Sequence, residues 1–407
     1  MGRNIIICTD GTANQFKPGR NSNVVKLYSV LERSGEQIIY YDPGVGTVGS
    51  YSALTWVARK AQWILGMAFG LGTTRDIIEA YSFLMENYRE GDRIFLFGFS
   101  RGAFTARAIA GLLYKCGLLH PNNQNLIPEA MRIYKGHRNW DVADGFRATY
   151  SRPPVPIHFL GLFETVTSVG WVWDPVRLDF TTTNPAILHV RHAMAIDERR
   201  AFFRANRWRR HGEAGGQDIR QVWFAGVHSD IGGGYPREES GLSNIGLEWM
   251  LVEAGRAGLR LDGGAAIRIV NDPAPDPGRD AHRSLRGAWW PAEVWPKLKN
   301  RRNRHGKWVR YPALNLAKRR GIYCDEPIHE TVVDRIAGRD DYPPPNLAGR
   351  KCRCKDDGTG AQACKHPESP VEARVPLGDF LQGGGPSGPG QPEVLPEGKE
   401  RMLDSGS

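Results

Sequence analysis

The chain has 407 residues, of which 41% are hydrophobic, and a formal net charge of +10. Six cysteines are too few and too unevenly spaced for a disulfide scaffold of this length, and no run reaches the roughly 18 apolar residues of a membrane span. The N-terminus enters an apolar run without a signal-peptide pattern, so we expect a soluble globular protein that is made in the cytoplasm and keeps its thiols reduced.

The positive charge is concentrated in two stretches, residues 199–210 and 297–310. Such a density favours a partner that presents phosphate, although a solvated surface is a commoner explanation. No aromatic-interleaved basic repeat of an RNA-binding sheet is present, so we expect no nucleic-acid partner. An anionic membrane surface is the partner to consider.

The first part of the chain alternates apolar runs with helical periodicity, which is typical of a parallel α/β sheet. The first run, Ile5–Cys8, predicts a buried strand, and the polar turn Asp10-Gly11-Thr12 follows it directly. Ligands bind at the carboxyl ends of strands in open α/β sheets, so Asp10 is a candidate pocket residue. The further expected elements are helices near 21–33 and 73–89 and strands near 37–41 and 93–97.

A G-x-S-x-G pattern with Ser100 at its centre joins the strand near 93–97 to a helical stretch at 103–113. In this strand–turn–helix setting the pattern is typical of a serine nucleophile, because the glycines let strand and helix pass close to the turn. The backbone N–H of Arg101 points at the same space and can stabilise an oxyanion, with Gly11 or Thr12 as a second donor. Taken alone, the five-residue pattern also arises by chance.

Two carboxylates are candidates for the acid of a catalytic triad. Glu164 follows a buried strand at 155–163, and Asp230 follows a strand at 221–226, in a glycine-rich loop that also contains His228. Both strand ends are places where α/β hydrolases carry this acid. The alternative role of Asp230 is to hold the loop by accepting backbone N–H bonds. We take His228 as a further candidate for the pocket.

The later part of the chain contains His329, at the start of a short helical pattern. The order serine, acid, histidine is the one expected of α/β hydrolases, so we assign the catalytic base to His329. A helix is expected at 243–257, an edge strand at 266–270 and a surface excursion at 272–311.

These elements predict one catalytic domain over residues 1–336, with insertions at about 120–152 and 272–311. Residues 337–407 have the Pro-, Gly- and Ser-rich composition of a disordered tail. The tail also contains a cluster that offers C-x-C and C-x-H pairs to zinc, but its spacing matches no standard finger and no metal is predicted. The cluster consists of Cys352, Cys354, Cys364 and His366.

The chain resembles a family of uncharacterised α/β hydrolases that includes the phospholipase effectors of bacterial type VI secretion systems. The segments that carry the resemblance are DGT at 10–12, YYDPGVGT at 40–47, GFSRGAFTAR at 98–107, GLFETVTSVG at 161–170, HAMAIDERR at 192–200, VWFAGVHSDIGGGY at 222–235 and IHE at 328–330. The resemblance implies an α/β-hydrolase fold with helices on both faces of the sheet, a serine esterase or phospholipase mechanism, and no cofactor. It also implies type VI export and a delivery or immunity partner.

The family usually has Asp where this chain has Glu164. Glutamate keeps the carboxylate and serves as triad acid in other hydrolases, so we favour Glu164 over Asp230. The predicted mechanism is hydrolysis of a lipid or other carboxylic ester, in which Ser100 attacks, His329 removes its proton and Glu164 orients the imidazole.

Two alternatives remain open. The Asp10 turn is similar to that of phosphatases whose nucleophilic aspartate lies two residues before a second one, although that earlier position is Cys8 here. The other alternative is a non-catalytic scaffold whose basic surface binds an acidic partner, with Ser100 inert.

Overall fold

The computed structural model describes most of the chain in ten ranges. These ranges are residues 2–11, 19–44, 71–137, 139–166, 178–210, 216–294, 296–302, 308–342, 344–348 and 370–383. Thr12 and the cluster Cys352, Cys354, Cys364 and His366 lie outside the described residues, so the predictions for them stay predictions.

An eight-stranded parallel sheet forms the centre of the molecule, in the order β10-β9-β6-β5-β4-β3-β1-β2. The strands are β1 (Asn4–Thr9), β2 (Gln37–Asp42), β3 (Arg93–Phe99), β4 (Ile157–Phe163), β5 (Ile187–Ala195), β6 (Asp218–Phe224), β9 (Ile328–His329) and β10 (Val371–Glu372). The central strands β1, β3 and β4 are buried along nearly their whole length, as expected for a parallel sheet covered on both faces. The predicted α/β class with a mostly parallel sheet is confirmed.

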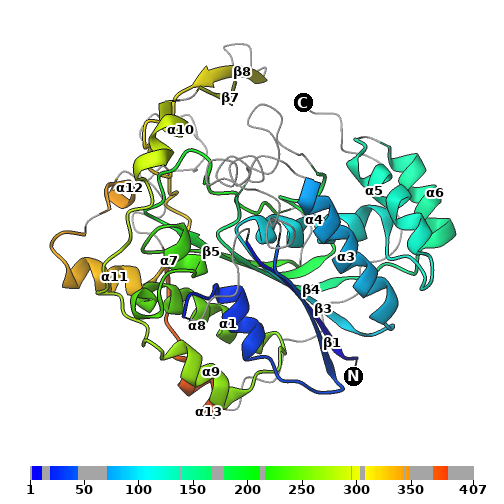
Figure 1. Cartoon of the computed structure of the whole chain (residues 1–407), viewed down its shortest axis with the longest axis horizontal. Coiled ribbons are helices and arrows are strands. Elements are labelled where there is room, and N and C mark those ends of the chain that lie inside the picture. The colour runs from blue at the N-terminus through cyan, green and yellow to red at the C-terminus, as the bar shows by residue number, and fades with distance from the viewer. Residues whose placement is uncertain are drawn as a thin grey trace, which may run out of the picture.

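Helices cover both faces of the sheet (Figure 1). Because side chains alternate along a strand, Ile5 and Ile7 pack with one layer while Ile6 and Cys8 pack with the other. The first layer consists of α3 (Leu71–Asn87), α4 (Arg101–Cys116), α5 (Ile127–Lys135) and α6 (Trp140–Tyr150). The second consists of α1 (Asn23–Ser29), α7 (His228–Gly232), α8 (Gly241–Arg256), α9 (Gly263–Val270) and α13 (Leu377–Gln382).

Two elements differ from the sequence predictions. The segment near 266–270 was expected as an edge strand, but it belongs to helix α9, whose Ala266 and Val270 face the core at helical spacing. Strand β5 was not predicted, because Arg191 and His192 interrupt its apolar run. Arg191 is tolerated there because its guanidinium donates to Glu253 and Asp218.

The two predicted insertions form ordered elements. The first supplies η2 (Gln124–Leu126), α5 and α6, and the second supplies η4 (Gly287–Trp289), α10 (Trp290–Val294) and an antiparallel hairpin of β7 (Lys297–Arg302) and β8 (Trp308–Ala313). The hairpin projects at the top of the molecule in the view of Figure 1. The remaining elements are η3 (Arg237–Glu239), α11 (Glu330–Gly338) and α12 (Pro345–Ala348).

The end of the chain differs from the prediction of a disordered tail over residues 370–383. Strand β10 pairs with β9, and α13 packs on α8 and α9 with Leu377 buried against them. Glu248 of α8 accepts bonds from Arg374 Nε at 2.8 Å and from the Leu377 backbone N–H at 3.1 Å. A few apolar residues within a polar segment thus suffice to dock it on the domain.

None of the helices within the described ranges is long and apolar enough to cross a bilayer. Cys8, Cys116 and Cys324 are buried.

Candidate active site

Ser100 lies on the sharp turn between β3 and α4, at the carboxyl edge of the sheet. Its backbone takes φ 58° and ψ −116°, a conformation that is strained for a residue with a side chain. The turn is held by a bond from the Ser100 N–H to the Phe163 carbonyl at 3.1 Å. A Cβ at Gly102 would lie 2.1 Å from the Thr9 carbonyl oxygen, so glycine is required where α4 meets the loop after β1.

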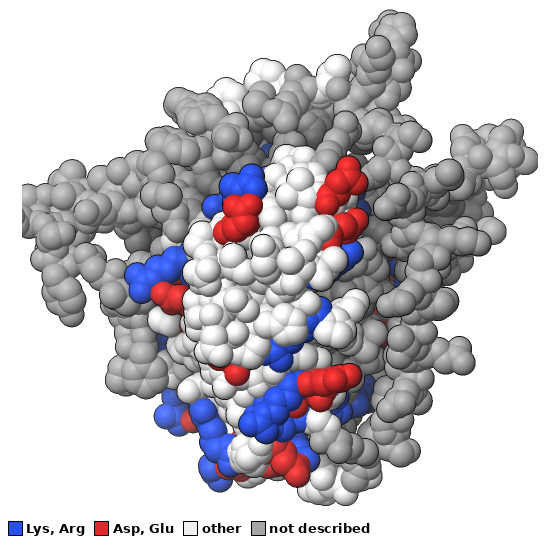
Figure 2. Space-filling view, turned by 90° about the vertical axis from the view of Figure 1, so that its right-hand side faces the viewer, with Lys and Arg blue, Asp and Glu red and all other residues white. Residues whose placement is uncertain are grey.

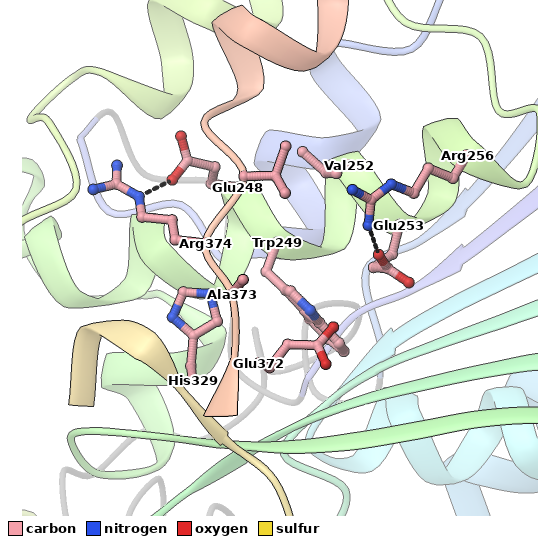
Figure 3. A pocket seen from close by; sticks show the side chains of 10 residues that line it. Glu248, Trp249, Val252, Glu253, Arg256, His329, Glu372, Ala373 and Arg374 are labelled. Carbon is pink, nitrogen blue, oxygen red and sulfur yellow. Dashed lines mark hydrogen bonds and ion pairs between the residues drawn. The ribbon is translucent and has the colours of Figure 1, made fainter. Parts of the chain in front are cut away.

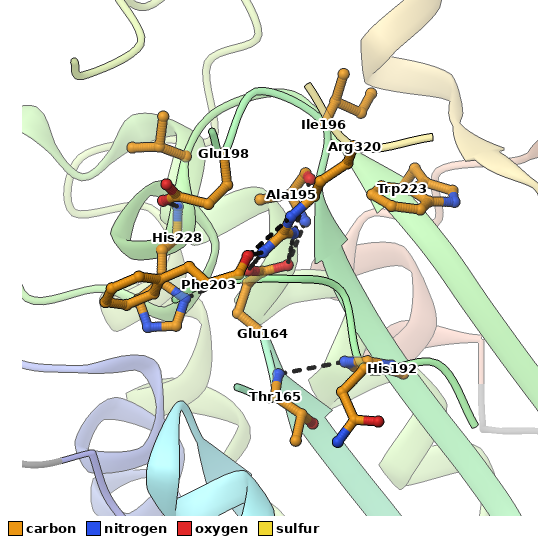
Figure 4. Close-up of polar contacts among 12 residues, drawn as sticks. Glu164, Thr165, His192, Ala195, Ile196, Glu198, Phe203, Trp223, His228 and Arg320 are labelled. Carbon is orange, nitrogen blue, oxygen red and sulfur yellow. Dashed lines mark hydrogen bonds and ion pairs between the residues drawn. The ribbon is translucent and has the colours of Figure 1, made fainter. Parts of the chain in front are cut away.

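Glu164 follows β4, the strand next to β3, and its carboxylate is buried among donors (Figure 4). Its Oε1 accepts from Arg320 Nη1 at 2.7 Å and from the Ala195 N–H, while Oε2 accepts from Arg320 Nη2 at 2.8 Å. Burial alone would raise the pKa of this carboxyl, but the charge of Arg320 and the bonds from Arg320 and His228 outweigh it and lower the pKa to about 2. Glu164 is therefore a permanently ionised group.

His228 is the first residue of α7, and its Nδ1 lies 3.3 Å from Glu164 Oε2. An ionised carboxylate can only accept, so Nδ1 carries the proton and Nε2 keeps its lone pair. The imidazole packs between Phe99 and Phe203, with ring centroids 4.8 and 4.7 Å away. Burial lowers the pKa of His228 below 6.5, with Glu164 opposing the shift. Since Phe99 precedes Ser100, a neutral imidazole lies beside the turn that carries Ser100.

Two residues that sequence reasoning did not single out complete this arrangement. Arg320 donates to Glu164 and, through Nε, to the Phe203 carbonyl at 3.2 Å. Glu198, which follows β5, accepts the His228 backbone N–H at 3.2 Å and the Arg200 guanidinium at 2.8 Å. Arg320 stands in a run of three basic residues that carries no signal for burial, whereas Glu198 stands at a strand end and would have followed from recognising β5.

His329, the residue assigned as base from the sequence, lies elsewhere. Strand β9 is four positions from β3 in the sheet, which corresponds to roughly 19 Å at the usual strand spacing. The His329 ring stacks on Phe224 at 4.7 Å, and its Nδ1 caps α11 through Thr331. The structure thus brings Glu164 to His228 and gives His329 a capping role. The physical reason is strand order, which chain order alone does not reveal.

His329 also lines a polar pocket between α8, β9 and β10 (Figure 3). Two ion pairs close this pocket, Arg374–Glu248 and Arg256–Glu253. Ser100, Glu164 and His228 are not among the residues that line it, and the docked segment 370–383 forms one of its walls.

Asp230, the alternative acid, holds the glycine-rich loop. Its Oδ2 accepts the backbone N–H groups of Val227 and His282 at 3.0 and 3.1 Å, and its Oδ1 lies 2.6 Å from His282 Nδ1. The His282 ring stacks on Tyr235 at 3.5 Å. Within the described ranges Asp230 is therefore paired with His282, while His228 is paired with Glu164.

The residues that follow β1 lie against the start of α4, where Gly102 approaches the backbone of Thr9 and Asp10. The Asp10 carboxylate is buried and accepts from Ser22 Oγ at 2.6 Å, from Tyr41 Oη at 3.0 Å and from the Gly11 N–H at 2.6 Å. Arg101 opens α4, so its N–H lies at the positive end of the helix dipole. The Gly11 N–H is engaged by Asp10, and Thr12 lies beyond the described residues.

No cluster of three or more His, Cys, Asp or Glu side chains suited to a metal occurs in the described part of the chain.

Residues 3–253 match the family model described as "T6SS, Phospholipase effector Tle1-like, catalytic domain". The chain belongs to this Tle1-like family. Ser100, Glu164 and His228 lie within the matched residues, whereas Arg320 and His329 lie beyond them.

The chain is also similar to the following protein sequence and solved structures. The uncharacterized protein YEL023C of Saccharomyces cerevisiae is 40% identical over 224 residues, which cover 50% of this chain and 32% of that protein. The chain thus spans about a third of that relative. The crystal structure of an uncharacterized protein from Pseudomonas aeruginosa has a TM-score of 0.39 and 22% identity. The match covers 64% of this chain and 46% of that chain. The structure of the Tle1 effector bound to the VgrG spike of the type VI secretion system has a TM-score of 0.38 and 16% identity. The match covers 70% of this chain and 81% of that chain.

Proposed function

We propose that the chain is a serine hydrolase that cleaves carboxylic esters of lipids, with Ser100 as nucleophile, His228 as general base and Glu164 as the acid that orients it. The observation that carries the proposal is the hydrogen bond between Glu164 and His228, whose ring packs on the residue before Ser100. Membership of a family described by phospholipase effectors supports a lipid ester as the substrate.

In the proposed reaction Ser100 Oγ attacks the acyl carbon while His228 Nε2 removes its proton. The ionised Glu164 stabilises the imidazolium that forms, and the Arg101 N–H stabilises the oxyanion with help from the dipole of α4. His228 then protonates the leaving alcohol, and a water molecule repeats the sequence to release the fatty acid. Catalytic hydrogen bonds tighten when substrate binds, so Ser100 and His228 need not be bonded beforehand.

His228 replaces His329 in this proposal, and Glu164 remains preferred to Asp230. A second oxyanion donor from Thr12, or from Gly11 once it leaves Asp10, remains a proposal. Type VI delivery of this chain, with a spike or immunity partner, is likewise a proposal that the family description supports.

No observation favours the phosphatase alternative. A phosphatase would need Asp10 exposed to substrate, but Asp10 is 1% exposed and bonded to Ser22 and Tyr41. Cys8 is also buried, and burial raises the pKa of its thiol, so it does not supply a nucleophile.

Lipid mass spectrometry of phosphatidylcholine, phosphatidylethanolamine and phosphatidylglycerol vesicles incubated with the chain tests the proposal. We expect release of fatty acid and lysophospholipid, and a loss of at least about 10³-fold in Ser100→Ala, because residues of a triad act as a unit. Ser29→Ala, which changes an exposed serine of α1, is the matched control and should behave as the parent. A fluorophosphonate probe should label the parent and the control alone. Undiminished release by Ser100→Ala would refute the nucleophile, and labelling of neither protein would favour the scaffold.

A further inference from the structure

The backbone of Glu164 is held in an unusual conformation. Its φ angle is 47°, in the left-handed region that is unfavourable for residues other than glycine. The backbone on either side of it is bound to neighbouring segments. The Glu164 N–H donates to the Ala193 carbonyl at 3.0 Å, and the Val166 N–H donates to the Ser100 carbonyl at 3.4 Å. The contacts that maintain this conformation also fix the direction in which the carboxylate points.

A side chain accepts the backbone N–H that lies between these two bonds. The Thr165 N–H donates to His192 Nε2 at 3.3 Å (Figure 4). Thr165 and His192 are each 1% exposed, so water does not take the place of this acceptor. A buried N–H that loses its acceptor destabilises the fold. His192 therefore fixes the peptide group that follows Glu164.

The bond with Thr165 determines the tautomer of His192. A backbone N–H can only donate, so Nε2 accepts through its lone pair and Nδ1 carries the proton of the neutral ring. Nδ1 lies 3.5 Å from Gln221 Oε1, an acceptor on the neighbouring strand β6. Gln221 is held by the Trp208 backbone, whose N–H donates to Oε1 at 2.6 Å and whose carbonyl accepts from Nε2 at 3.0 Å. His192 is thus an acceptor for Thr165 only in its neutral form.

The buried guanidinium of Arg107 opposes protonation of His192. Arg107 lies in α4, donates to the Thr181 and Asn206 carbonyls at 3.2 and 2.8 Å, and has Nη2 3.5 Å from His192 Nδ1. No carboxylate is among its hydrogen-bond partners in the described part of the chain. Burial, together with the charge of Arg107, lowers the pKa of His192 to about 3. The ring is therefore neutral near pH 7.

The charged side chains on the outside of the same helical layer are arranged differently. Figure 2 shows acidic and basic side chains next to one another on the face that carries α5 and α6, at the right of Figure 1. Arg132 and Glu129 on α5 form such an exposed ion pair. A guanidinium that is buried without an acid is costly, so the pairing that accounts for surface charges does not account for Arg107. Keeping a proton off the neighbouring imidazole is a role that its position fits.

We propose that His192 is a positioning residue of the hydrolase site. By accepting the Thr165 N–H, it holds Glu164 in the left-handed conformation that aims the carboxylate at His228. The inference rests on the proposed function for the role of the Glu164–His228 pair. His192 acts through Glu164 and takes no part in proton transfer, while Arg107 supports it by keeping the ring neutral.

The first test compares variants of His192 in the hydrolysis of a soluble p-nitrophenyl ester. His192→Leu removes the acceptor and should lower kcat by about 10- to 100-fold, because small displacements of a catalytic group are costly. KM should change by less than about threefold, since substrate contacts are kept. His192→Gln places an amide oxygen near the position of Nε2 and should restore kcat to within about fivefold of the parent. Rescue by Gln and the selective loss of kcat are not expected of a merely structural residue.

A double-mutant cycle tests whether His192 works through Glu164. In a chain that carries Glu164→Gln, the further change His192→Leu should lower kcat by less than about twofold, because the carboxylate to be aimed is gone. Equal losses in the two backgrounds, or a parent-like kcat in His192→Leu alone, would overturn the inference.

His158→Leu is the matched control. His158 lies near the start of β4 with its Nε2 2.7 Å from the Ala257 carbonyl, so this variant also loses a bond between a histidine and the backbone. Its melting temperature should fall as that of His192→Leu does, while its kcat should stay within about threefold of the parent. An equal loss of kcat in both variants would mean that general destabilisation explains the effect, against the inference.

A readout that does not depend on catalysis separates this inference from the proposed function. The proton on His228 Nδ1 gives a downfield ¹H NMR resonance when it is shared with Glu164, and its absence from His228→Gln identifies it. We expect this resonance in the parent and in His192→Gln but not in His192→Leu. Full activity of Ser100→Ala would remove the proposed nucleophile and leave this pattern unaffected, whereas an unchanged resonance in His192→Leu would overturn the positioning role alone.

Discussion

At the residue scale, one carboxylate serves two partners in the candidate site. Arg320 keeps Glu164 ionised although burial opposes it, and the ionised Glu164 in turn holds the Nδ1 proton of His228. His228 is then neutral near pH 7, since burial lowers its pKa below 6.5, and its Nε2 is ready to accept a proton. Arg320, which lies more than 150 positions downstream of Glu164, therefore helps to set the tautomer of His228.

Substitution of the two histidines separates the competing bases. His228→Gln keeps a donor for Glu164 but removes the proton acceptor, so kcat/KM on a soluble p-nitrophenyl ester should fall by about 10²- to 10⁴-fold. His329→Asn keeps an N-cap for α11 and should stay within about threefold of the parent. If His329→Asn were the inactive variant and His228→Gln the active one, the assignment of the base would be reversed.

At the element scale, close contacts position the turn at Ser100 and the segment 370–383. The first turn of α4 approaches the loop after β1 so closely that Gly102 has no room for a side chain. Residues 370–383 extend the sheet by β10 and cover α8 and α9 with α13, where Gly255 leaves space for the Phe380 ring. Both contacts join parts of the chain that are far apart in sequence.

Gly102→Ala tests the first contact. The added Cβ would lie 2.1 Å from the Thr9 carbonyl oxygen, so the loop or the helix must move. We expect this movement to lower the free energy of unfolding by about 1–3 kcal/mol and the rate of ester hydrolysis at least about tenfold. Gly145→Ala in α6 is the control, because its Cβ meets nothing within 4 Å and should stabilise the helix by about 0.5–1 kcal/mol. Urea unfolding and initial rates measure both. An active, unshifted Gly102→Ala would contradict the packing argument.

Leu377→Ala tests the second contact. Leu377 is 1% exposed against α8 and α9, so its truncation should lower the free energy of unfolding by about 2–4 kcal/mol in urea denaturation. Val371→Ala in β10 is the control, since Val371 is 53% exposed and should change stability little. Equal stability of both variants would mean that the segment does not contribute to the domain.

At the scale of the whole molecule, several histidines are buried in neutral form on or beside the sheet. Burial lowers the pKa of His158 to about 4 and the pKa values of His192 and His329 to about 3. In the unfolded chain these groups take up protons near pH 6.5, whereas the folded chain does so only at lower pH. The unfolded state therefore binds more protons between pH 6.5 and about 3, and stability must fall as the pH falls through that window.

We expect the free energy of unfolding to drop by on the order of 3–5 kcal/mol between pH 7 and pH 4, measured by urea denaturation. Asp76 acts in the opposite sense, because burial and the nearby Asp42 raise its pKa to about 7, but it is one group against three histidines. His329→Asn removes one of the three and should make the loss smaller. Stability that is constant or higher at pH 4 would show that the histidines are not buried as described.

Local signals in the sequence sufficed for much of the sheet and for placing Ser100 and Glu164 at the ends of neighbouring strands. The strands at 4–9, 93–99 and 157–163 follow from apolar runs, and Ser100 follows from glycines that make its turn possible. Strand β5 was not predicted from the sequence, because Arg191 interrupts its apolar run and is buried in an ion pair. The structures of helix α9 and of the docked segment 370–383 were not predicted either. Short amphipathic segments are stabilised mainly by the surface on which they pack, which the local sequence does not reveal.

The strained turn at Ser100, the carboxylate of Glu164 at the end of the next strand and the basic stretch at 297–310 were determined by the sequence alone, because each depends on neighbouring residues. The partner of the acid was decided by the tertiary structure. His228 and His329 both follow strands, but the sheet order and the path of α7 carry His228 back over Phe99, while β9 leaves His329 against Phe224. Convergence of side chains depends on strand order and helix placement, which arise from packing across the whole core and are not written in any local pattern.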